Sequence, residues 1–334
     1  MKKISSLFLC FIMLLGVAGC DATGYPSETD MEYMAAALGF DASKNGVTAL
    51  AEIIVINSDS KAEGTAKTVL SAEGETVKTA IYNLRASLSK PLMLNHCGLL
   101  VLDSRLGREQ IREIWEYCFD EKNITQAIET VCTDNAEELM NLKPSSAVAM
   151  GYEISTSLKQ NSEYTGIKYR NRYYQIENLR QRKSNSYAIP FLSVIEQKHK
   201  IDGLQIYYND NAFSIINEQG AALFSMLNNS FEKGTLNIEK SCFNVTLKSV
   251  NYNFSYKNDK LNIKLTLNLN GEKNSVETVE RSIDNIVLYK SDVYGIADEI
   301  YRRDIKLWNK IKDNYKDVFS AADIKISVRR VNNG

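Results

Sequence analysis

The stretch CGLLVL, residues 97–102, has the composition of a strand buried at the centre of a sheet. It is short, apolar at successive positions and bounded by polar residues, which is typical of a strand covered on both faces. Upstream, Glu75–Leu88 carries apolar residues at helical spacing, and downstream Ser104 can cap a second helix. The predicted buried face of that second helix comprises Ile111, Ile114, Trp115, Cys118 and Phe119.

The alternation of strand and helix extends on both sides of this core. Two apolar segments, Met31–Phe40 and Val47–Ile56, flank a turn ending in Asn45-Gly46 and predict a β-hairpin. Residues 57–74 are polar and contain glycine, so we expect a loop there. Ala127–Cys132 predicts another strand, and the whole order indicates a mixed α/β domain. The helices expected after that strand run from Asp134 or Asn135 to Pro144 and from Ser145 or Ser146 to Leu158.

The second half of the chain has a different pattern. Residues 160–186 are polar and rich in arginine and tyrosine, which favours a connector. Leu204–Tyr208 and Phe213–Ile216 flank Asn209-Asp210 and predict a hairpin, so we expect an α+β region with antiparallel pairing. The other expected elements are a helix over Gln219–Leu227, strands over Phe243–Tyr256 and Lys260–Leu269, a helical region from Val276 to about Trp308 with Val276, Val279, Ile283, Ile286 and Val287 on one face, and a last strand over Ile324–Val331.

The N-terminal residues have the pattern of a secretion signal. Lys2 and Lys3 precede an apolar run from about Leu7 to Val17. This run of about 11 residues is shorter than the about 20 that a helix needs to cross a bilayer. Small residues then lead into Cys20, as in the bacterial lipobox, so we expect residues 1–19 to be a signal peptide and Cys20 to carry a diacylglyceryl anchor. The alternative is an ordinary signal peptide followed by a chance cysteine.

Charge and cysteine content exclude some classes of partner and of fold. Removing Lys2 and Lys3 with the signal from the 40 basic residues leaves 38 basic against 41 acidic side chains. This balance gives no reason to expect nucleic acid or an anionic surface as partner. Four further cysteines are spaced too widely for a disulfide framework, so we favour free, buried thiols. These are Cys97, Cys118, Cys132 and Cys242.

A search of the sequence for chemistry gives no catalytic or metal-binding motif. His96 and His199 are the two histidines, and His96-Cys97 is the only close pair of histidine or cysteine residues that includes a histidine. Adjacent residues on a strand point to opposite faces, so this pair does not predict a metal site. The sequence has no G-x-S-x-G elbow, glycine-rich phosphate loop or HExxH. We therefore expect no catalytic residue, no cofactor and no metal.

Three polar segments have a functional and a structural interpretation. Lys168–Lys183 interleaves arginine with tyrosine, as in sites for single-stranded nucleic acid, but a linker or docking face is the better interpretation in an exported, slightly acidic protein. Asn209–Asn211 could ligate calcium, although this composition more often forms a turn. Glu137-Glu138 could be an acid/base pair, yet such pairs are more often the solvated face of a helix.

The order of several short motifs resembles the C subunits of GerA-type spore germinant receptors, the Ger(x)C family of spore germination lipoproteins. These motifs are Gly19-Cys20, Leu38-Gly-Phe-Asp41, Gly74-Glu-Thr76, Asn95-His96 before Leu99–Leu102, Ser104–Gly107, Ala188-Ile-Pro190, Ser291–Gly295, Trp308–Asn314 and the closing strand. The resemblance covers nearly the whole chain after Cys20. It departs at Asp21-Ala22, where the family often has Trp-Asp, at Ile305, where proline is common, and at Tyr315, where tryptophan is frequent.

The resemblance implies a non-enzymatic protein on the outer face of the spore's inner membrane. There it would assemble with an integral A subunit and a transporter-like B subunit into a nutrient germinant receptor. It also implies three mixed α/β domains, so we divide the second half near Ser241. The resulting multi-domain α+β division is 1–19 signal peptide, 20–29 membrane-proximal spacer, 30–160 N-terminal α/β domain, 161–186 linker, 187–240 middle α+β subdomain and 241–334 C-terminal α+β domain.

A second function fits the same N-terminal pattern. A substrate-binding lipoprotein would also be exported and tethered, and it would deliver a small ligand to a membrane transporter. Such proteins normally have two similar α/β lobes around a cleft. The antiparallel α+β pattern of the second half favours the receptor subunit instead.

Overall fold

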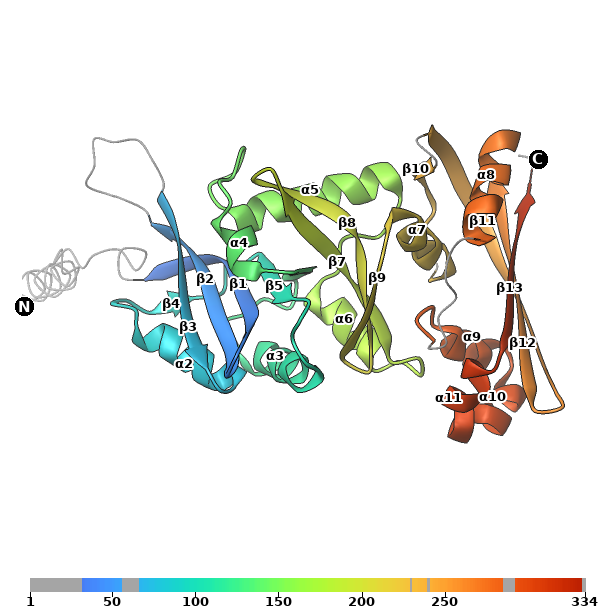
Figure 1. Ribbon diagram of the computed structural model, residues 1–334, viewed down its shortest axis with the longest axis horizontal. Coiled ribbons are helices and arrows are strands. Elements are labelled where there is room, and N and C mark those ends of the chain that lie inside the picture. The colour runs from blue at the N-terminus through green and yellow to red at the C-terminus, as the bar shows by residue number, and fades with distance from the viewer. Residues whose placement is uncertain (1–31, 56–65, 229, 239–240, 285–291, 332–334) are drawn as a thin grey trace, which may run out of the picture. The chain divides into compact units, whose positions relative to one another are not determined.

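The computed structural model describes residues 32–55, 66–228, 230–238, 241–284 and 292–331. These residues form two sheets and several helices, an α+β arrangement (Figure 1). The first sheet has the strand order β3-β2-β1-β5-β6-β7-β8-β9, with β4 paired to β1. Its strands are β1 (Tyr33–Ser43), β2 (Gly46–Val55), β3 (Ala66–Gly74), β4 (Leu92–Met93), β5 (Leu99–Asp103), β6 (Glu129–Thr133), β7 (Ser186–Ile195), β8 (Lys198–Tyr208) and β9 (Asn211–Ile216).

The predicted hairpins and central strand of the first sheet are confirmed. β1 and β2 pair antiparallel around the turn before Gly46, and β8 and β9 pair around Asn209-Asp210. β5 lies between β1 and β6 and is parallel to both. Every residue of β5 is buried, as the apolar run Leu99–Leu102 predicts for a strand covered on both faces.

Helices cover both faces of the first sheet, which explains the burial of its central strands (Figure 1). One face packs against α2 (Val77–Ala86), α3 (Arg108–Asp120) and α6 (Tyr173–Arg180). The other face packs against α4 (Ala136–Asn141), α5 (Met150–Thr165) and α7 (Glu218–Leu227).

The predicted loop over residues 57–74 is wrong from Ala66 onward. Residues 56–65 lie outside the described part, but β3 follows them and pairs antiparallel with β2 at the edge of the sheet. Thr68, Ser71 and Glu73 on this strand are exposed. An edge strand has fewer neighbours to pack against, so its polar sequence does not distinguish it from a loop.

The second predicted helix begins later and buries a narrower face than expected. Ser104 does not cap it, because α3 starts after Gly107 while the Ser104 hydroxyl donates to Asp134 at 2.7 Å. Phe119, predicted to be buried, has 69% of its surface exposed, whereas Cys118 is buried. Successive helical residues differ by about 100° in direction, so Phe119 has already turned away from the sheet.

The next two helices are close to their predicted positions. Asn135 caps α4, accepting a hydrogen bond from the Glu138 backbone N–H at 2.9 Å, as one of the two predicted caps. The following helix, α5, begins at Met150 instead of Ser145 or Ser146. Both serines instead donate backbone N–H groups to the Glu153 carboxylate.

The segment 161–186, expected to be a linker, is packed structure. It contains the end of α5 and helix α6, and four of its side chains belong to the two apolar cores beside the first sheet, namely Ile167, Tyr169, Tyr173 and Ile176. Its buried polar residues are Thr165, Asn171, Ser184 and Ser186. The polar composition of this segment does not indicate α6, because only two residues of that helix, Tyr173 and Ile176, are buried. The domain boundaries themselves stay a prediction.

The second sheet has the order β10-β11-β12-β13 and is covered on one face. Along β12, Leu261, Ile263, Leu265 and Leu267 are buried, while Lys260 and Lys264 are exposed. This alternation confirms the two long strands predicted here. The strands are β10 (Lys233–Ile238), β11 (Ser241–Lys257), β12 (Lys260–Asn270) and β13 (Asp323–Arg330), and the helices after β12 are α8 (Lys273–Asp284), α9 (Ile296–Arg303), α10 (Ile305–Ile311) and α11 (Tyr315–Ser320).

Two expectations for the C-terminal half are corrected. β13 pairs parallel to β12, so the pairing is not wholly antiparallel, and the helices between these strands form the long crossover that a parallel pair requires. The helical region expected from Val276 to about Trp308 is not continuous, because α8, α9 and α10 are separate. Ile286 and Val287, placed on its apolar face, lie outside the described residues.

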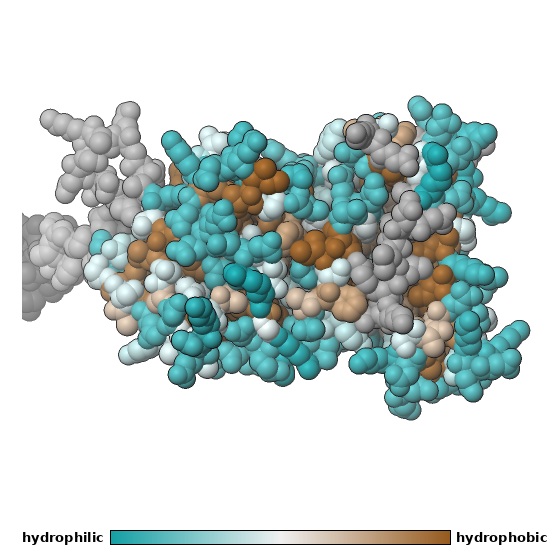
Figure 2. Space-filling model, in the orientation of Figure 1, coloured by the Kyte–Doolittle hydropathy of each residue, from teal (hydrophilic) through white to brown (hydrophobic). Residues whose placement is uncertain are grey.

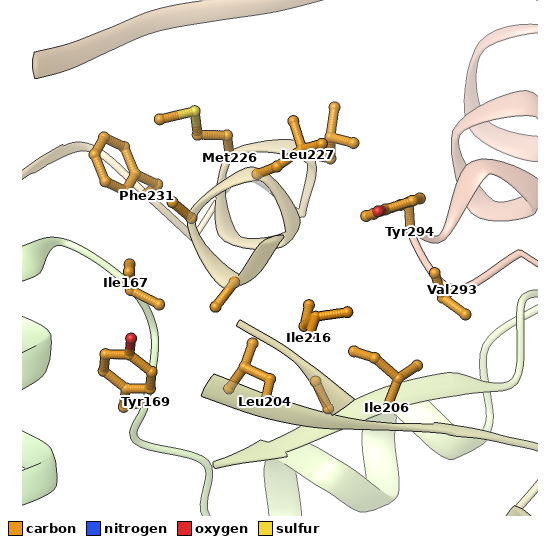
Figure 3. Packing of buried hydrophobic residues seen from close by; sticks show 14 of the residues in the cluster. Ile167, Tyr169, Leu204, Ile206, Ile216, Met226, Leu227, Phe231, Val293 and Tyr294 are labelled. Carbon is orange, nitrogen blue, oxygen red and sulfur yellow. The ribbon is translucent and has the colours of Figure 1, made fainter. Parts of the chain in front are cut away.

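Helix α7 lies within an apolar cluster that includes residues of both sheets. Figure 3 shows Ile216 of β9 on one side of α7 and Met226 and Leu227 on the opposite side of the helix, with Tyr294 from the segment before α9 facing α7. All of these residues belong to one buried cluster that continues into the second sheet. One face of the first sheet is therefore linked to the second sheet by continuous apolar packing, and a division into three domains stays a prediction.

Candidate functional site

Three of the four cysteines in the described part of the chain are buried. Cys97, Cys118 and Cys132 are free and buried, as predicted, whereas Cys242 is free but exposed and so departs from the predicted buried thiol. Burial raises the pKa of the Cys97 and Cys132 thiols to about 12, so both stay protonated near neutral pH. Cys20, the predicted lipidation site, lies outside the described residues.

The histidines do not form a metal centre in the described part of the chain. Among residues 32–55, 66–228, 230–238, 241–284 and 292–331, no group of three or more histidine, cysteine, aspartate or glutamate side chains could hold a metal ion. His96 is exposed in a turn and its backbone carbonyl accepts from the Tyr152 hydroxyl at 3.1 Å. Burial lowers the pKa of His199, which lies on β8.

Three buried carboxylates bind the N-terminal backbone of helices. Asp41 at the end of β1 accepts from the backbone N–H groups of Ala136 and Glu137 at the start of α4. Desolvation raises the pKa of Asp41, against the lowering effect of those two hydrogen bonds. The carboxylate therefore accepts hydrogen bonds from two of the N–H groups that have no partner within the helix, as is the case at the start of every helix.

Glu52 does the same for α5. Its side chain is fully buried on β2 and accepts from the backbone N–H groups of Met150 and Gly151, both at 2.8 Å. Lys67 Nζ donates to the same carboxylate at 2.9 Å and also to the Met140 carbonyl at 2.6 Å. Glu52 thus joins β2, β3 and two helices through one buried polar cluster.

Asp292 repeats the arrangement at α9. Its carboxylate accepts from Ile296 N and Ala297 N at 2.7 and 2.6 Å and from the Tyr315 hydroxyl at 2.8 Å. Desolvation raises the pKa of Asp292 to about 6, despite these three donors. The Ser186 hydroxyl on β7 donates to the Asp292 carbonyl, so this contact also joins α9 to the first sheet. All three carboxylates have structural partners that account for their burial.

Two of the four arginines of the basic stretch 168–183, Arg170 and Arg180, form ion pairs with carboxylates. Arg170 forms an ion pair with the buried Glu129. Arg180 donates Nε and Nη2 to the two Asp210 oxygens at 2.7 and 2.6 Å and Nη1 to Glu177 at 2.6 Å. Since Tyr169 and Tyr173 are also buried, the stretch does not present the open row of arginine and tyrosine that single-stranded nucleic acid needs.

The Asn209–Asn211 motif forms a turn. Asn209 and Asp210 both have positive φ, 52° and 61°, as expected for a tight β8–β9 hairpin. The Asp210 carboxylate, which was one candidate calcium ligand, is bound by Arg180 and by the Tyr187 hydroxyl at 3.0 Å. Glu137 and Glu138 are exposed in the first turn of α4, which is the solvated helix face that the sequence favoured.

A polar pocket of about 290 Å³ lies beside this turn. Its lining comes from the start of α3, the end of α6, Asn185 and the β8–β9 turn. Arg108 and Arg112 of α3 line this pocket together with Arg180 and Asp210. Sequence analysis did not identify Arg108, Arg112 or Asn185, because nothing in their local spacing indicates that α3 lies against a turn about 100 residues later.

A second polar pocket of about 440 Å³ lies at the carboxyl ends of the parallel strands β1, β5 and β6. It is lined by residues of both charges, including Lys44, Glu73, Arg105 and Glu137. Among its lining residues, Asp41 accepts from the backbone N–H groups of Ala136 and Glu137, and Arg105 donates a two-pronged hydrogen bond to Asp103. The Asp41 and Arg105 side chains are thus already engaged with partners inside the protein.

Exposed apolar side chains lie apart from one another on a surface that is mainly hydrophilic. On the face drawn in Figure 2, hydrophilic residues dominate and hydrophobic residues form small separate groups. Phe213 and Ile215, on the edge strand β9, are 42% and 44% exposed. Within the described ranges, no helix is long and apolar enough to span a bilayer.

Two protein-family descriptions match this chain, in the same order as the two halves of the fold. "Spore germination protein N-terminal domain" matches residues 27–196, and "Spore germination B3/ GerAC like, C-terminal" matches residues 272–330. A solved structure described as "Crystal Structure of the GerBC protein" is 14% identical, with a TM-score of 0.49, covering 89% of this chain and 97% of that chain. No curated protein matches the chain.

Proposed function

We propose, from the premise that the chain belongs to the Ger(x)C family of spore germination proteins, that it is the C subunit of a nutrient germinant receptor. The observation that carries this proposal is the match of residues 27–196, half of the chain, to the N-terminal domain of spore germination proteins. The match of residues 272–330 to a GerAC-like C-terminal region supports it, because both regions occur in one chain.

The proposed subunit acts by contact with other proteins and not by catalysis. Its partners would be the membrane A and B subunits of the receptor. The buried carboxylates Asp41, Glu52 and Asp292 support this view, because each is engaged by the backbone of a helix and has a structural role. The raised pKa of Cys97 and Cys132 supports it as well, since neither thiol would ionise near neutral pH.

The proposed location is the outer face of the spore's inner membrane, with lipid on Cys20 as the anchor. The support is the sequence pattern alone: a basic start, a short apolar run and small residues before a cysteine. A diacylglyceryl group provides two acyl chains, and stable anchoring needs more than one chain.

The anchor is tested by Cys20→Ala, with Cys10→Ala as matched control. Both variants remove one N-terminal thiol, but only the first removes the proposed acceptor of the lipid. We expect Cys20→Ala to move the protein from the membrane fraction to the soluble fraction, and Cys10→Ala to leave it at the membrane. Retention of Cys20→Ala in the membrane fraction would contradict the anchor.

The receptor function is tested by deleting the gene in a spore-forming host from which other nutrient receptors have been removed. We expect the deletion strain to lose the germination response to at least one nutrient, and the unaltered gene to restore it. Affinity purification of the tagged protein from membranes should recover an A and a B subunit. A normal response to every nutrient in the deletion strain would overturn the proposed function.

A further inference from the structure

The pocket between α3, α6 and the β8–β9 turn has features that the proposed function does not use. One wall is fixed, because Arg180 donates to Asp210 and to Glu177, and Asp210 also accepts from Tyr187. The side chains of Arg180 and Asp210 are 17% and 9% exposed, so this ion pair is shielded from water. The wall cannot offer a free carboxylate to a cation, since protein donors already occupy Asp210.

The other wall carries two arginines with little compensating charge. Arg108 and Arg112 are four residues apart on α3, so their side chains lie on one face of the helix. Within the described residues Arg108 forms no salt bridge, and Arg112 has a 3.4 Å contact with Glu109, whose side chain is 74% exposed. Exposed contacts of this kind contribute little, so both guanidinium groups stay available to a ligand.

The pocket lining has an excess of positive charge. Three arginines face two carboxylates, Glu177 and Asp210, and both carboxylates are bound to Arg180. At the rim, the Asn185 amide donates to the Asn209 side-chain oxygen at 3.1 Å, which fixes two neutral polar groups beside the arginines. The lining is polar and offers no wall for an apolar ligand.

We propose that this pocket binds a small, doubly charged oxyanion through Arg108 and Arg112. Guanidinium groups bind carboxylate and phosphate oxygens in pairs with matched geometry, which a single ammonium group cannot do. The volume of about 290 Å³ suits an inorganic phosphate or a short dicarboxylate more than a drug-sized molecule. Because the α3 N-terminus lies beside Arg108, its positive dipole end adds to the attraction.

The test is calorimetric titration of the full-length protein, purified in a non-ionic detergent, with sodium phosphate and separately with sodium succinate. Ionic strength is held constant with sodium chloride, so that a general salt effect does not register as binding. The variant Arg108→Gln/Arg112→Gln removes both guanidinium groups from exposed positions on α3 and should fold. The matched control is Arg329→Gln, an exposed arginine on β13 far along the chain.

We expect saturable binding of at least one of the two anions to the unaltered protein and to Arg329→Gln. The double variant should bind the same anion about tenfold more weakly or not at all, as expected for the loss of charge-assisted hydrogen bonds. Tighter binding of phosphate or of succinate identifies which oxyanion class the site takes. No saturable binding to the unaltered protein, or equal binding to the double variant, would overturn the proposal. Neither result bears on the receptor function, which rests on the family membership.

Discussion

The two sheets of this protein differ in how many of their faces are covered by other parts of the chain. The first sheet is covered by helices on both faces, and its strand β5 is buried at each of its five positions. The second sheet is covered on one face, and along β12 from Lys260 to Leu267 buried aliphatic residues alternate with polar residues that are at least partly exposed. In the first sheet, polar groups that reach the interior must therefore find partners inside the protein, whereas in the second they can turn to water.

This difference determines where single substitutions are costly. Glu52 in the first sheet is fully buried and has three donors, so its removal would leave Lys67 and two helix N–H groups without their acceptor. Polar residues on the outer face of the second sheet have water as an alternative partner. The two sheets should thus differ most in their response to polar substitutions.

The largest effect is expected for Glu52→Gln. The variant keeps the shape of the side chain but removes the charge that Lys67 and the start of α5 require. We expect a loss of about 3–5 kcal/mol in the free energy of unfolding, measured by urea denaturation followed by circular dichroism. The control Glu116→Gln, on the exposed face of α3, should stay within about 0.5 kcal/mol. A loss below about 1 kcal/mol for Glu52→Gln would contradict the idea that buried polar groups of the first sheet depend on partners inside the protein.

The alternation in β12 gives the second prediction. Leu265→Ala removes a side chain that is 1% exposed on the covered face, so it should cost about 2–5 kcal/mol. Its neighbour Lys264 points to the opposite, exposed face, and Lys264→Ala should change stability by about 0.5 kcal/mol or less. Both can be measured by the same urea denaturation. Similar costs at the two positions would show that the outer face is covered as well.

Asp292 predicts a pH dependence. Its pKa is raised by desolvation to about 6 in the folded protein, above the ordinary value of 3.8, so the folded state binds this proton more tightly than the unfolded state. The stabilisation from the protonated carboxyl is complete below about pH 4 and is lost as pH rises through about 6. The variant Asp292→Asn lacks this titrating carboxyl, so its stability should not fall for this reason as pH rises through about 6. We therefore expect the stability of the natural protein relative to Asp292→Asn to fall between pH 4 and 7, and a flat difference would contradict the raised pKa.

The smallest effect is expected on the outer face of the second sheet. Thr266 and Ser327 face each other across β12 and β13, with their hydroxyl oxygens 3.2 Å apart. Thr266→Val should change the free energy of unfolding by about 0.5 kcal/mol or less, because water replaces the lost partner and valine suits a strand. Thermal unfolding would measure it. A cost above about 2 kcal/mol would mean that this pair is not solvated.

The parts of the fold that sequence predicts depend on local patterns. The Asn45-Gly46 turn identifies the first hairpin, the run Leu99–Leu102 identifies the central strand, and Asn135 identifies the start of α4. Each of these signals lies within a few residues of the feature it specifies. These three elements can therefore be predicted without knowledge of the rest of the chain.

The parts that sequence missed depend on distant contacts. Strand β3 is polar and becomes a strand through its pairing with β2, and helix α6 is defined by a narrow face against the first sheet. Glu52 reaches α5 nearly 100 residues later. The candidate pocket likewise joins Arg108 to Asp210, and no local periodicity links positions so far apart. The two pockets could not be predicted from the sequence for the same reason.

Along the strand order from β3 to β9, β6 and β7 are the pair with the fewest paired residues. Cys132 pairs with Phe191 and Thr133 with Leu192, whereas the neighbouring β5–β6 ladder runs over five residue pairs. Few interstrand hydrogen bonds resist separation along this line, so the sheet should open here before it opens elsewhere. Amide protons of residues 191–192 are then expected to exchange with solvent sooner than those of residues 100–102. A partner that pulls on the strands to one side of the β6–β7 pair would bend the molecule at this pair.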